Sequence, residues 1–267
     1  MRVLTKNGRT DGTNRRWLRQ TLDLIAPRFC PICDRRLCAC EDVVCAGCNF
    51  NLPRTYLWKD PYDNAMARLF WGVFPIERCA AYLYYAAHSE LSDLIHDMKY
   101  HGRPDYAEMM GFMAAQELAR SGFFEGIDVL VPVPLTKGRE RERGYNQCVS
   151  LARGVMSATG IGMATKALKR KSFVQSQTQM TMMDRRENVN GAFRAGDTRQ
   201  IEGKHVLLID DVVTTGSTMK ACAKALSEME GLKISVMSLC LARNPFEKVN
   251  DELPQDYRWR LGLPEKK

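Results

Sequence analysis

A strand that ends in two adjacent carboxylates restricts the fold of this 267-residue chain more than any other feature. The run VLLI at 206–209 has the length and apolar character of a strand that is covered on both faces. Asp210 and Asp211 follow it directly, and the polar stretch TTGST at 214–218 then leads into a helical pattern at 217–229. A strand, a polar turn and a helix in this order predict a βα unit of a parallel sheet.

The same alternation of strands and helices continues on both sides of this unit. Ser89 is suited to cap a helix, Pro104 to begin one and Gly160 to end one. We expect strands at 79–85, 128–133 and 233–241, and helices at 89–98, 104–121 and 145–159. The fold class is therefore α/β, with a parallel sheet flanked by helices on both faces.

Composition divides the chain into five segments. Residues 27–58 are rich in cysteine and have little helical or strand periodicity, and Pro61 and Pro75 punctuate the residues that follow. We expect a basic N-terminal tail with a short helix at 1–26, a cysteine module at 27–58, a linker at 59–78, an α/β domain at 79–243 and a C-terminal tail at 244–267.

The formal net charge of +8 and the isoelectric point near 9.0 favour anionic partners, but they do not choose between nucleic acids and phosphorylated metabolites. The least polar stretch, 79–87, is far shorter than the ~20 residues that cross a membrane. The basic N-terminus lacks the apolar segment of a secretory signal. We therefore expect a cytoplasmic protein, in which metal binding explains ten cysteines better than disulfides do.

Two C-x-x-C pairs lie close together in the cysteine module. Cys30 and Cys33 form the first pair, and Cys45 and Cys48 form the second. Each pair can bring two thiolates onto one ion, at a Zn–S distance of about 2.3 Å. This spacing predicts a structural Zn²⁺ site with four cysteine ligands. A redox-active dithiol is the alternative interpretation.

The other six cysteines fall into two groups. Cys38 and Cys40 could replace a ligand or support a second site, although C-x-C is a poorer chelating spacing. The remaining four lie in strand or helix patterns and are expected in the core: Cys79, Cys148, Cys222 and Cys240. The module as a whole could contact DNA through its arginines or could only brace the N-terminus.

The residues after the apolar strand are suited to bind an anion beside hydroxyl groups. In an open parallel sheet, ligands bind beyond the carboxyl ends of the strands, where Asp210 and Asp211 are expected. The turn Thr214–Thr218 offers hydroxyl groups and the free N–H groups of a helix N-terminus, and Gly216 allows a close backbone approach. A sugar phosphate satisfies both parts. The turn matches neither the Walker A pattern nor the dinucleotide-binding pattern. The alternative to a phosphate site is an ordinary polar βα turn before a capped helix.

The stretch VLLIDDVVTTGST at 206–218 resembles the phosphoribosyl pyrophosphate (PRPP) motif of type I phosphoribosyltransferases. The resemblance implies that Asp210 and Asp211 hold the ribose 2′ and 3′ hydroxyl groups and that the turn holds the 5′-phosphate. It also implies that Mg²⁺ bridges the pyrophosphate and the ribose hydroxyl groups and is held mainly through PRPP. The implied PRPP-binding residues are Asp210, Asp211, Val212, Val213, Thr214, Thr215, Gly216, Ser217 and Thr218.

Five further segments resemble the ComF/GntX family, whose members are associated with competence for DNA uptake. They are MKYHGR at 98–103, LVPVPL at 130–135, RGYNQ at 143–147, SFVQSQT at 172–178 and RRENVNGAF at 185–193. The resemblance covers about residues 26–243, with no departure within the PRPP motif. It implies PRPP or a related sugar phosphate as the ligand, and single-stranded DNA and DNA-uptake proteins as partners. No residue identifies the acceptor of the phosphoribosyl group.

Three cationic residues join Asp210 and Asp211 as candidate catalytic residues. Lys99 lies in a loop with a glycine, as in the pyrophosphate loop of type I enzymes, although Lys and Gly are common in any loop. Arg139 and Arg143 belong to an alternating run of arginine and glutamate, which is typical of a self-neutralising surface. The family resemblance instead implies a mobile lid whose arginines close on the pyrophosphate. The acid-free segment 153–183 could contact nucleic acid or be solvated.

Three functions are compatible with this sequence. The first is a PRPP-dependent glycosyltransferase, in which cations and positioning promote the departure of pyrophosphate. The second is a non-catalytic protein that senses PRPP or a nucleotide while its cysteine module and basic surface handle single-stranded DNA. The third is a zinc-braced scaffold for partner proteins, which the intact PRPP motif disfavours.

Overall fold

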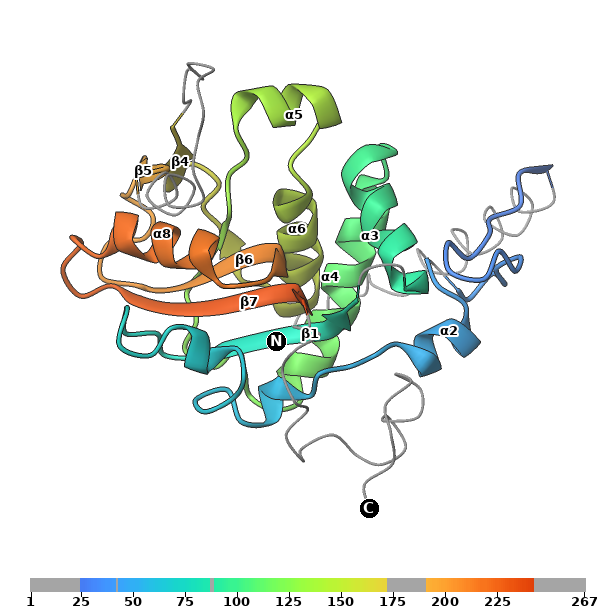
Figure 1. Ribbon diagram of the computed structural model, residues 1–267, viewed down its shortest axis with the longest axis horizontal. Coiled ribbons are helices and arrows are strands. Elements are labelled where there is room, and N and C mark those ends of the chain that lie inside the picture. The colour runs from blue at the N-terminus through green and yellow to red at the C-terminus, as the bar shows by residue number, and fades with distance from the viewer. Residues whose placement is uncertain (1–24, 42, 87–88, 172–190, 243–267) are drawn as a thin grey trace, which may run out of the picture. The chain divides into compact units, whose positions relative to one another are not determined.

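A division between Leu52 and Pro53 separates the chain into two units. The computed structural model describes residues 25–41, 43–86, 89–171 and 191–242, and the structural statements concern these residues (Figure 1). In the first unit, an antiparallel bridge joins Phe29 to Arg36, and helix α2 spans Ala46–Asn51.

A five-stranded parallel sheet organises the second unit, in the order β1-β7-β6-β2-β3. Its strands are β1 (Cys79–Tyr85), β2 (Val129–Pro132), β3 (Gly162–Met163), β6 (His205–Val213) and β7 (Lys233–Ala242). A short antiparallel hairpin, β4 (Leu168–Arg170) with β5 (Phe193–Ala195), forms a second sheet. The apolar run of β6 is buried because the strand pairs with β2 on one side and β7 on the other.

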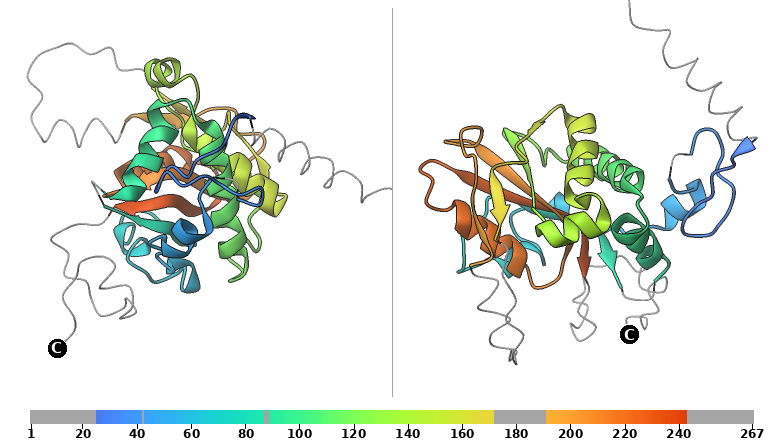
Figure 2. Two further views of the ribbon diagram at one scale, coloured as in Figure 1. Left: turned by 90° about the vertical axis from the view of Figure 1, so that its right-hand side faces the viewer. Right: turned by 90° about the horizontal axis from the view of Figure 1, so that it is seen from above.

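Helices cover both faces of this sheet (Figure 2). The described helices of this unit are η1 (Leu57–Lys59), η2 (Ala67–Leu69), α3 (Glu90–Tyr100), α4 (Pro104–Ala119), α5 (Lys137–Arg143), α6 (Gln147–Thr159) and α8 (Ser217–Leu226), of which α5 buries no residue. Val206 and Leu208 of β6 share a core cluster with Cys222 of α8, whereas α4 and α6 pack together on the opposite face. The α/β class with a parallel sheet is confirmed.

The expected elements form, and their ends follow local signals. Asn146 caps α6, because its side chain accepts a hydrogen bond from the N–H of Cys148 at 2.9 Å. Gly160 ends the same helix in the left-handed region, at φ 75°. Strand β6 is longer than expected, because its pairing with β7 continues to Val213. Asp210 and Asp211 therefore lie within the strand rather than after it.

Residues 59–78, expected as a linker, instead form part of the second unit. Met66 and Phe70 belong to the same core cluster as Cys79 and Ala81 of β1. Asn64 is buried and donates to the carbonyl oxygen of Cys79 at 2.9 Å. The unit boundary at Leu52 also lies before the expected end of the cysteine module at residue 58. These apolar residues lack a regular period, which is why sequence patterning did not place them in the core.

The expected N-terminal tail and helix at 1–26 lie outside the described residues except for residues 25 and 26, and the expected C-terminal tail at 244–267 lies wholly outside them. The segments SFVQSQT at 172–178 and RRENVN at 185–190 also fall outside them. Among the helices that the structure describes, none is long and apolar enough to cross a membrane.

The contact between α4 and α6 depends on two glycines that let the backbones approach each other. A Cβ atom at Gly111 would overlap the carbonyl oxygen of Leu151. A Cβ atom at Gly154 would overlap the carbonyl oxygen of Glu108 and lie 2.6 Å from the backbone nitrogen of Phe112. Backbone atoms cannot move aside as a flexible side chain can, so substitution at these positions forces the helices apart.

We predict that Gly154→Ala lowers the free energy of unfolding by about 1–3 kcal/mol, the usual cost of overpacking a core. Gly138→Ala in α5 is the matched control, since among the described residues no atom beyond its chain neighbours and its own helix backbone lies within 4 Å of the added Cβ. That control should be neutral or stabilising by up to about 1 kcal/mol, because alanine favours helices. Urea denaturation followed by circular dichroism measures both, and equal stabilities for the two variants would contradict the prediction.

Candidate functional site

The two carboxylates of β6 are almost completely buried: Asp210 is 7% exposed and Asp211 is 6% exposed. The Asp210 Oδ1 atom accepts hydrogen bonds from the Cys148 thiol at 3.3 Å and from the N–H of Asp211 at 2.9 Å. The Asp211 Oδ1 atom accepts from the N–H of Val212 at 2.7 Å. Burial, together with the neighbouring charge of Asp211, raises the pKa of Asp210 to about 7. Among the described residues, Asp210 therefore has no ion-pair partner.

Asp211 has a cationic partner that comes from a distant part of the chain. The Lys99 Nζ atom, in the last turn of α3, lies 3.0 Å from Asp211 Oδ2, and its side chain is 23% exposed. Burial is the largest influence on Lys99 and lowers its pKa, but the charge and hydrogen bond of Asp211, together with the charge of Asp210, outweigh it and the net shift is upward. The Gln147 Nε2 atom donates a second hydrogen bond to Asp211 Oδ2, at 3.2 Å. The ion pair is thus enclosed and additionally hydrogen-bonded.

Gln147 also connects this ion pair to α5. Its Oε1 atom accepts from Arg143 Nη1 at 2.8 Å, and Arg143 Nη2 donates to the Tyr100 hydroxyl group at 3.3 Å. The Arg143 guanidinium lies 4.8 Å from the centre of the Tyr100 ring. Its Nε atom is buried and has no hydrogen-bond partner among the described residues. Through these contacts, helices α3, α5 and α6 share one polar network with Asp211.

The turn after β6 forms a hollow at the start of α8. Gly216 is the N-cap of α8 at φ 71°, and the ring of Phe70 would lie 3.4 Å from a Cβ atom there. The Thr215 hydroxyl donates to Ser217 Oγ at 3.2 Å. The hollow is lined by Asp210, Val212, Val213, Thr214, Gly216, Ser217, Thr218 and Met219. A helix N-terminus with hydroxyl groups around it can hold a phosphate.

The structure brings four of the five candidate catalytic residues into one region. Asp210, Asp211, Lys99 and Arg143 lie at or beside the carboxyl end of β6. Arg139 is exposed on α5, and its side chain forms no ion pair or hydrogen bond among the described residues. The three arginines of the alternating run therefore differ: Arg143 joins the network, whereas Arg139 and Arg141 are exposed.

Sequence reasoning assigned no role to three residues of this region. Gln147 and Cys148 open α6 and bond to the two carboxylates, as described above. Arg170, at the end of β4, stacks on Phe193 with 5.2 Å between its guanidinium and the ring centre. Burial and the charge of Arg139 lower the pKa of Arg170, while Asp210 acts in the opposite direction. Gln147 belongs to the segment RGYNQ and Arg170 to the acid-free segment 153–183. These patterns marked the segments, but they did not assign a role to either residue.

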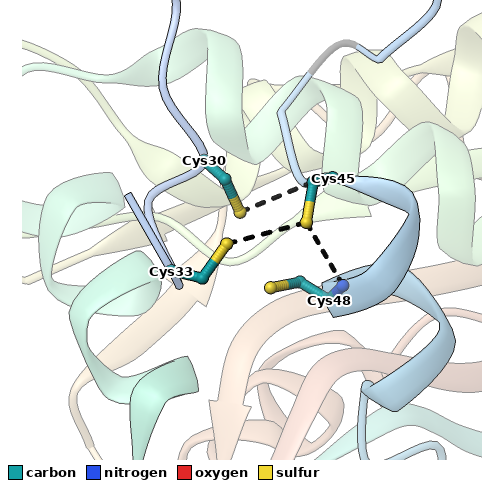
Figure 3. A group of neighbouring side chains, drawn as sticks. All are labelled: Cys30, Cys33, Cys45 and Cys48. Atoms are coloured by element: carbon teal, nitrogen blue, oxygen red, sulfur yellow. Dashed lines mark hydrogen bonds between the residues drawn. The ribbon is translucent and has the colours of Figure 1, made fainter. Parts of the chain in front are cut away.

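The sulfur atoms of the two C-x-x-C pairs converge in the first unit (Figure 3). One sulfur from each of Cys30, Cys33, Cys45 and Cys48 lies within 4.8 Å of the others. Backbone N–H groups bond to two of these sulfurs: Cys45 N–H to Cys30 Sγ and Cys48 N–H to Cys45 Sγ, both at 3.4 Å. The N–H of Cys48 lowers the pKa of Cys45 to about 7, which favours the thiolate that binds metals.

Glu41 braces the loop between the two pairs. It accepts hydrogen bonds from the N–H groups of Cys38 at 2.8 Å and Ala46 at 2.7 Å, and it pairs with Arg35 at 2.9 Å. These donors lower the pKa of Glu41. Cys38 and Cys40 are exposed and do not belong to the four-sulfur cluster. The cluster could therefore hold a metal ion with four cysteine ligands.

The remaining four cysteines, Cys79, Cys148, Cys222 and Cys240, are buried in the second unit, which confirms that prediction.

Comparison with known families identifies the second unit. The family model of the phosphoribosyl transferase domain matches residues 111–260, which is more than half of the chain. The chain therefore belongs to the phosphoribosyl transferase domain family. Asp210, Asp211, Arg143 and the turn lie inside the matched residues, whereas Lys99 precedes them.

Two curated relatives are similar to this chain over part of their length. DNA utilization protein YhgH from Salmonella typhi is 29% identical over 153 residues, which are 56% of this chain and 66% of the relative. Competence protein F from Haemophilus influenzae is 30% identical over 132 residues, which are 49% of this chain and 58% of the relative. The match thus spans less than two thirds of each relative. Among solved structures, a glutamine phosphoribosylpyrophosphate amidotransferase from B. subtilis aligns with a TM-score of 0.39 and 21% identity, over 64% of this chain and 38% of that one.

The raised pKa of Asp210 predicts how pH acts on stability. Asp has a pKa of about 3.9 in unfolded chains, so the folded protein binds more protons between roughly pH 4 and pH 7. The contribution of Asp210 to the free energy of unfolding should therefore fall as pH rises through that window. Asp210→Asn removes this contribution, so the stability of the variant minus that of the wild type should increase from pH 5 to pH 8. Urea denaturation at each pH measures the difference, and a constant or decreasing difference contradicts the assignment.

Proposed function

We propose that this chain binds PRPP at Asp210–Thr218 and transfers its phosphoribosyl group to an acceptor, as a type I phosphoribosyltransferase related to competence proteins. The observation that carries the proposal is the pair of adjacent buried carboxylates, of which Asp210 lines the hollow at the start of α8. Membership of the phosphoribosyl transferase domain family supports it. The carboxylates would accept hydrogen bonds from the ribose hydroxyl groups, and the turn would hold the 5′-phosphate.

The cationic residues would stabilise the departure of pyrophosphate. Cleavage of the C1–O bond leaves positive charge on the ribose ring and negative charge on the leaving group, so fixed cations stabilise the transition state. On PRPP binding, ribose hydroxyl groups would replace Lys99 as donors to Asp211, and the freed ammonium group could turn to the pyrophosphate. Arg143, with its unpaired Nε–H, and the exposed Arg139 would supply further positive charge. Mg²⁺ bound with PRPP would neutralise part of the pyrophosphate charge, and carboxylate oxygens are donors that it accepts.

We expect Asp210→Asn and Asp211→Asn to weaken PRPP binding by about one to two decades, since a hydrogen bond to a charged group contributes about 1.5–3 kcal/mol. Gly216→Val should weaken it further, because a β-branched side chain resists φ 71° and occupies the hollow. Calorimetric titration of PRPP with Mg²⁺ measures all three. Asp197→Asn is the control, since that carboxylate is 37% exposed, pairs with Arg199 at 2.7 Å and does not line the hollow, and it should bind like the wild type. Absence of binding by the wild type, or equal binding by all variants, would exclude this site.

Catalysis and sensing differ in one measurable respect. Incubating the protein with PRPP, Mg²⁺ and candidate nucleobase or amine acceptors should release pyrophosphate if the chain is a transferase. Binding of PRPP without release under any of these conditions would favour the non-catalytic sensor.

A role in the handling of single-stranded DNA is the second candidate, and the names of the two relatives favour it. The net charge of +8 is consistent with contacts to phosphates. Such contacts release counterions, so log K for an oligonucleotide should fall linearly with log salt concentration. Fluorescence anisotropy at several salt concentrations tests this, and undetectable binding at low salt would remove the support from charge.

We infer that the four-sulfur cluster holds one structural Zn²⁺. Sulfur atoms around a tetrahedral ion at about 2.3 Å lie about 3.8 Å from one another. The distance between Cys33 Sγ and Cys45 Sγ is 3.7 Å, which fits that arrangement. Two N–H···S bonds already orient the ligands, whereas a redox dithiol would need only one of the pairs.

We predict that purified protein contains one equivalent of zinc and that Cys45→Ser loses it. Cys38→Ser is the matched control, because that exposed thiol lies outside the cluster, and it should retain the metal. Chelation should unfold the first unit before the second, since a structural metal contributes directly to folding. Elemental analysis of the three proteins is the measurement. Zinc content that is unaffected by Cys45→Ser would disprove the ligand set.

A further inference from the structure

A second cluster of metal-binding side chains lies at the end of α3, separate from the four cysteines. One ligand atom from each of His96, Asp97 and His101 lies within 4.8 Å of the others. The His101 Nδ1 atom is 2.6 Å from Asp97 Oδ1, and the rings of His96 and His101 meet edge to face with 4.9 Å between their centres. Both histidines are exposed, so an ion can reach them from solvent.

The backbone holds this cluster in place before any ion arrives. His96 and Asp97 lie on α3, whose opposite face buries Leu94, Ile95 and Met98 in the core. His101 follows the helix directly, and its N–H donates to the carbonyl oxygen of Asp97 at 3.2 Å. The three side chains therefore need little rearrangement to converge on one ion, which lowers the entropic cost of binding.

We propose that His96, Asp97 and His101 bind a divalent transition-metal ion, of the kind represented by Zn²⁺, Co²⁺ or Ni²⁺. Two imidazoles and one carboxylate suit these ions, whereas Mg²⁺ and Ca²⁺ prefer oxygen ligands alone. The ion would replace the direct contact between Asp97 Oδ1 and His101 Nδ1. Water would complete the coordination shell on the exposed side.

The position of this cluster gives the proposed ion a structural consequence. Residues 96 to 101 span the last turn of α3, and that turn carries Lys99, which reaches Asp211, and Tyr100, which contacts Arg143. An ion that joins His96 to His101 would close this turn from outside and restrict its opening. Its relevance to catalysis rests on the proposed function, but binding of the ion and protection of the turn do not.

The test uses full-length, tag-free protein that already contains its zinc, with Ni²⁺ as the probe. Calorimetric titration should show one additional equivalent of Ni²⁺ for the wild type. His96→Asn and His101→Asn should each weaken this binding at least about tenfold, the scale seen when a metal site loses part of its support. His205→Gln is the control, because His205 lies on β6 and pairs with Ser235 Oγ at 2.8 Å, and it should bind like the wild type.

Hydrogen exchange measured by mass spectrometry is the second readout. Peptides covering 96–103 should exchange more slowly with Ni²⁺ in the wild type, but not in His101→Asn. The proposal is overturned if zinc-loaded wild type takes up no further Ni²⁺, or if both asparagine variants bind as tightly as the wild type. Because neither readout involves PRPP, failure here and failure of the proposed function are distinguishable.

Discussion

The ion pair between Lys99 and Asp211 is the interaction on which the arrangement of the site depends. Two adjacent carboxylates at the end of a buried strand repel each other and lose hydration, and a cation within the same enclosure offsets both effects. Within the part of the chain that the structure describes, Asp211 has a cationic partner at 3.0 Å, whereas Asp210 accepts hydrogen bonds from a thiol and a backbone N–H. The folded protein therefore holds an excess of unmatched acceptors at this point, which a ligand rich in hydroxyl groups can satisfy.

The helices and strands around this ion pair each supply different groups to the site. Helix α3 supplies the lysine, α6 supplies Gln147 and Cys148, and α5 supplies Arg143 through Gln147. Strand β6 and the start of α8 place the carboxylates next to the hollow. A ligand that takes over the hydrogen bonds of Asp211 would loosen Lys99 and Gln147, and through Gln147 it would also change the contacts of Arg143. Binding at the turn and the placement of the cations are therefore physically linked.

Local patterns were sufficient to predict four of the five strands of the parallel sheet, most helix positions and the turn at Gly216, because strand burial, caps and turn geometry each depend on neighbouring residues. Strand β3 and the hairpin of β4 and β5 were not predicted, since strands of two or three residues are too short to show a period. The spacing of Cys30, Cys33, Cys45 and Cys48 likewise predicted which sulfurs converge. The core position of Met66 and Phe70 was not predictable, since it arises from tertiary packing without a period. The partner of Asp211 was not predictable either. The sequence indicated Lys99 as a possible pyrophosphate ligand. Its contact with Asp211, a carboxylate far along the chain, depends on how α3 packs. Gln147 could be assigned a role only when its two partners were known.

A crystal structure of the protein with PRPP and Mg²⁺ tests the central claim most directly. The account predicts the 5′-phosphate on the backbone N–H groups of Thr214–Thr218, the ribose hydroxyl groups on Asp210 and Asp211, and Lys99 withdrawn from Asp211. PRPP bound elsewhere, or PRPP at the turn with the Lys99–Asp211 ion pair still at 3.0 Å, would contradict it.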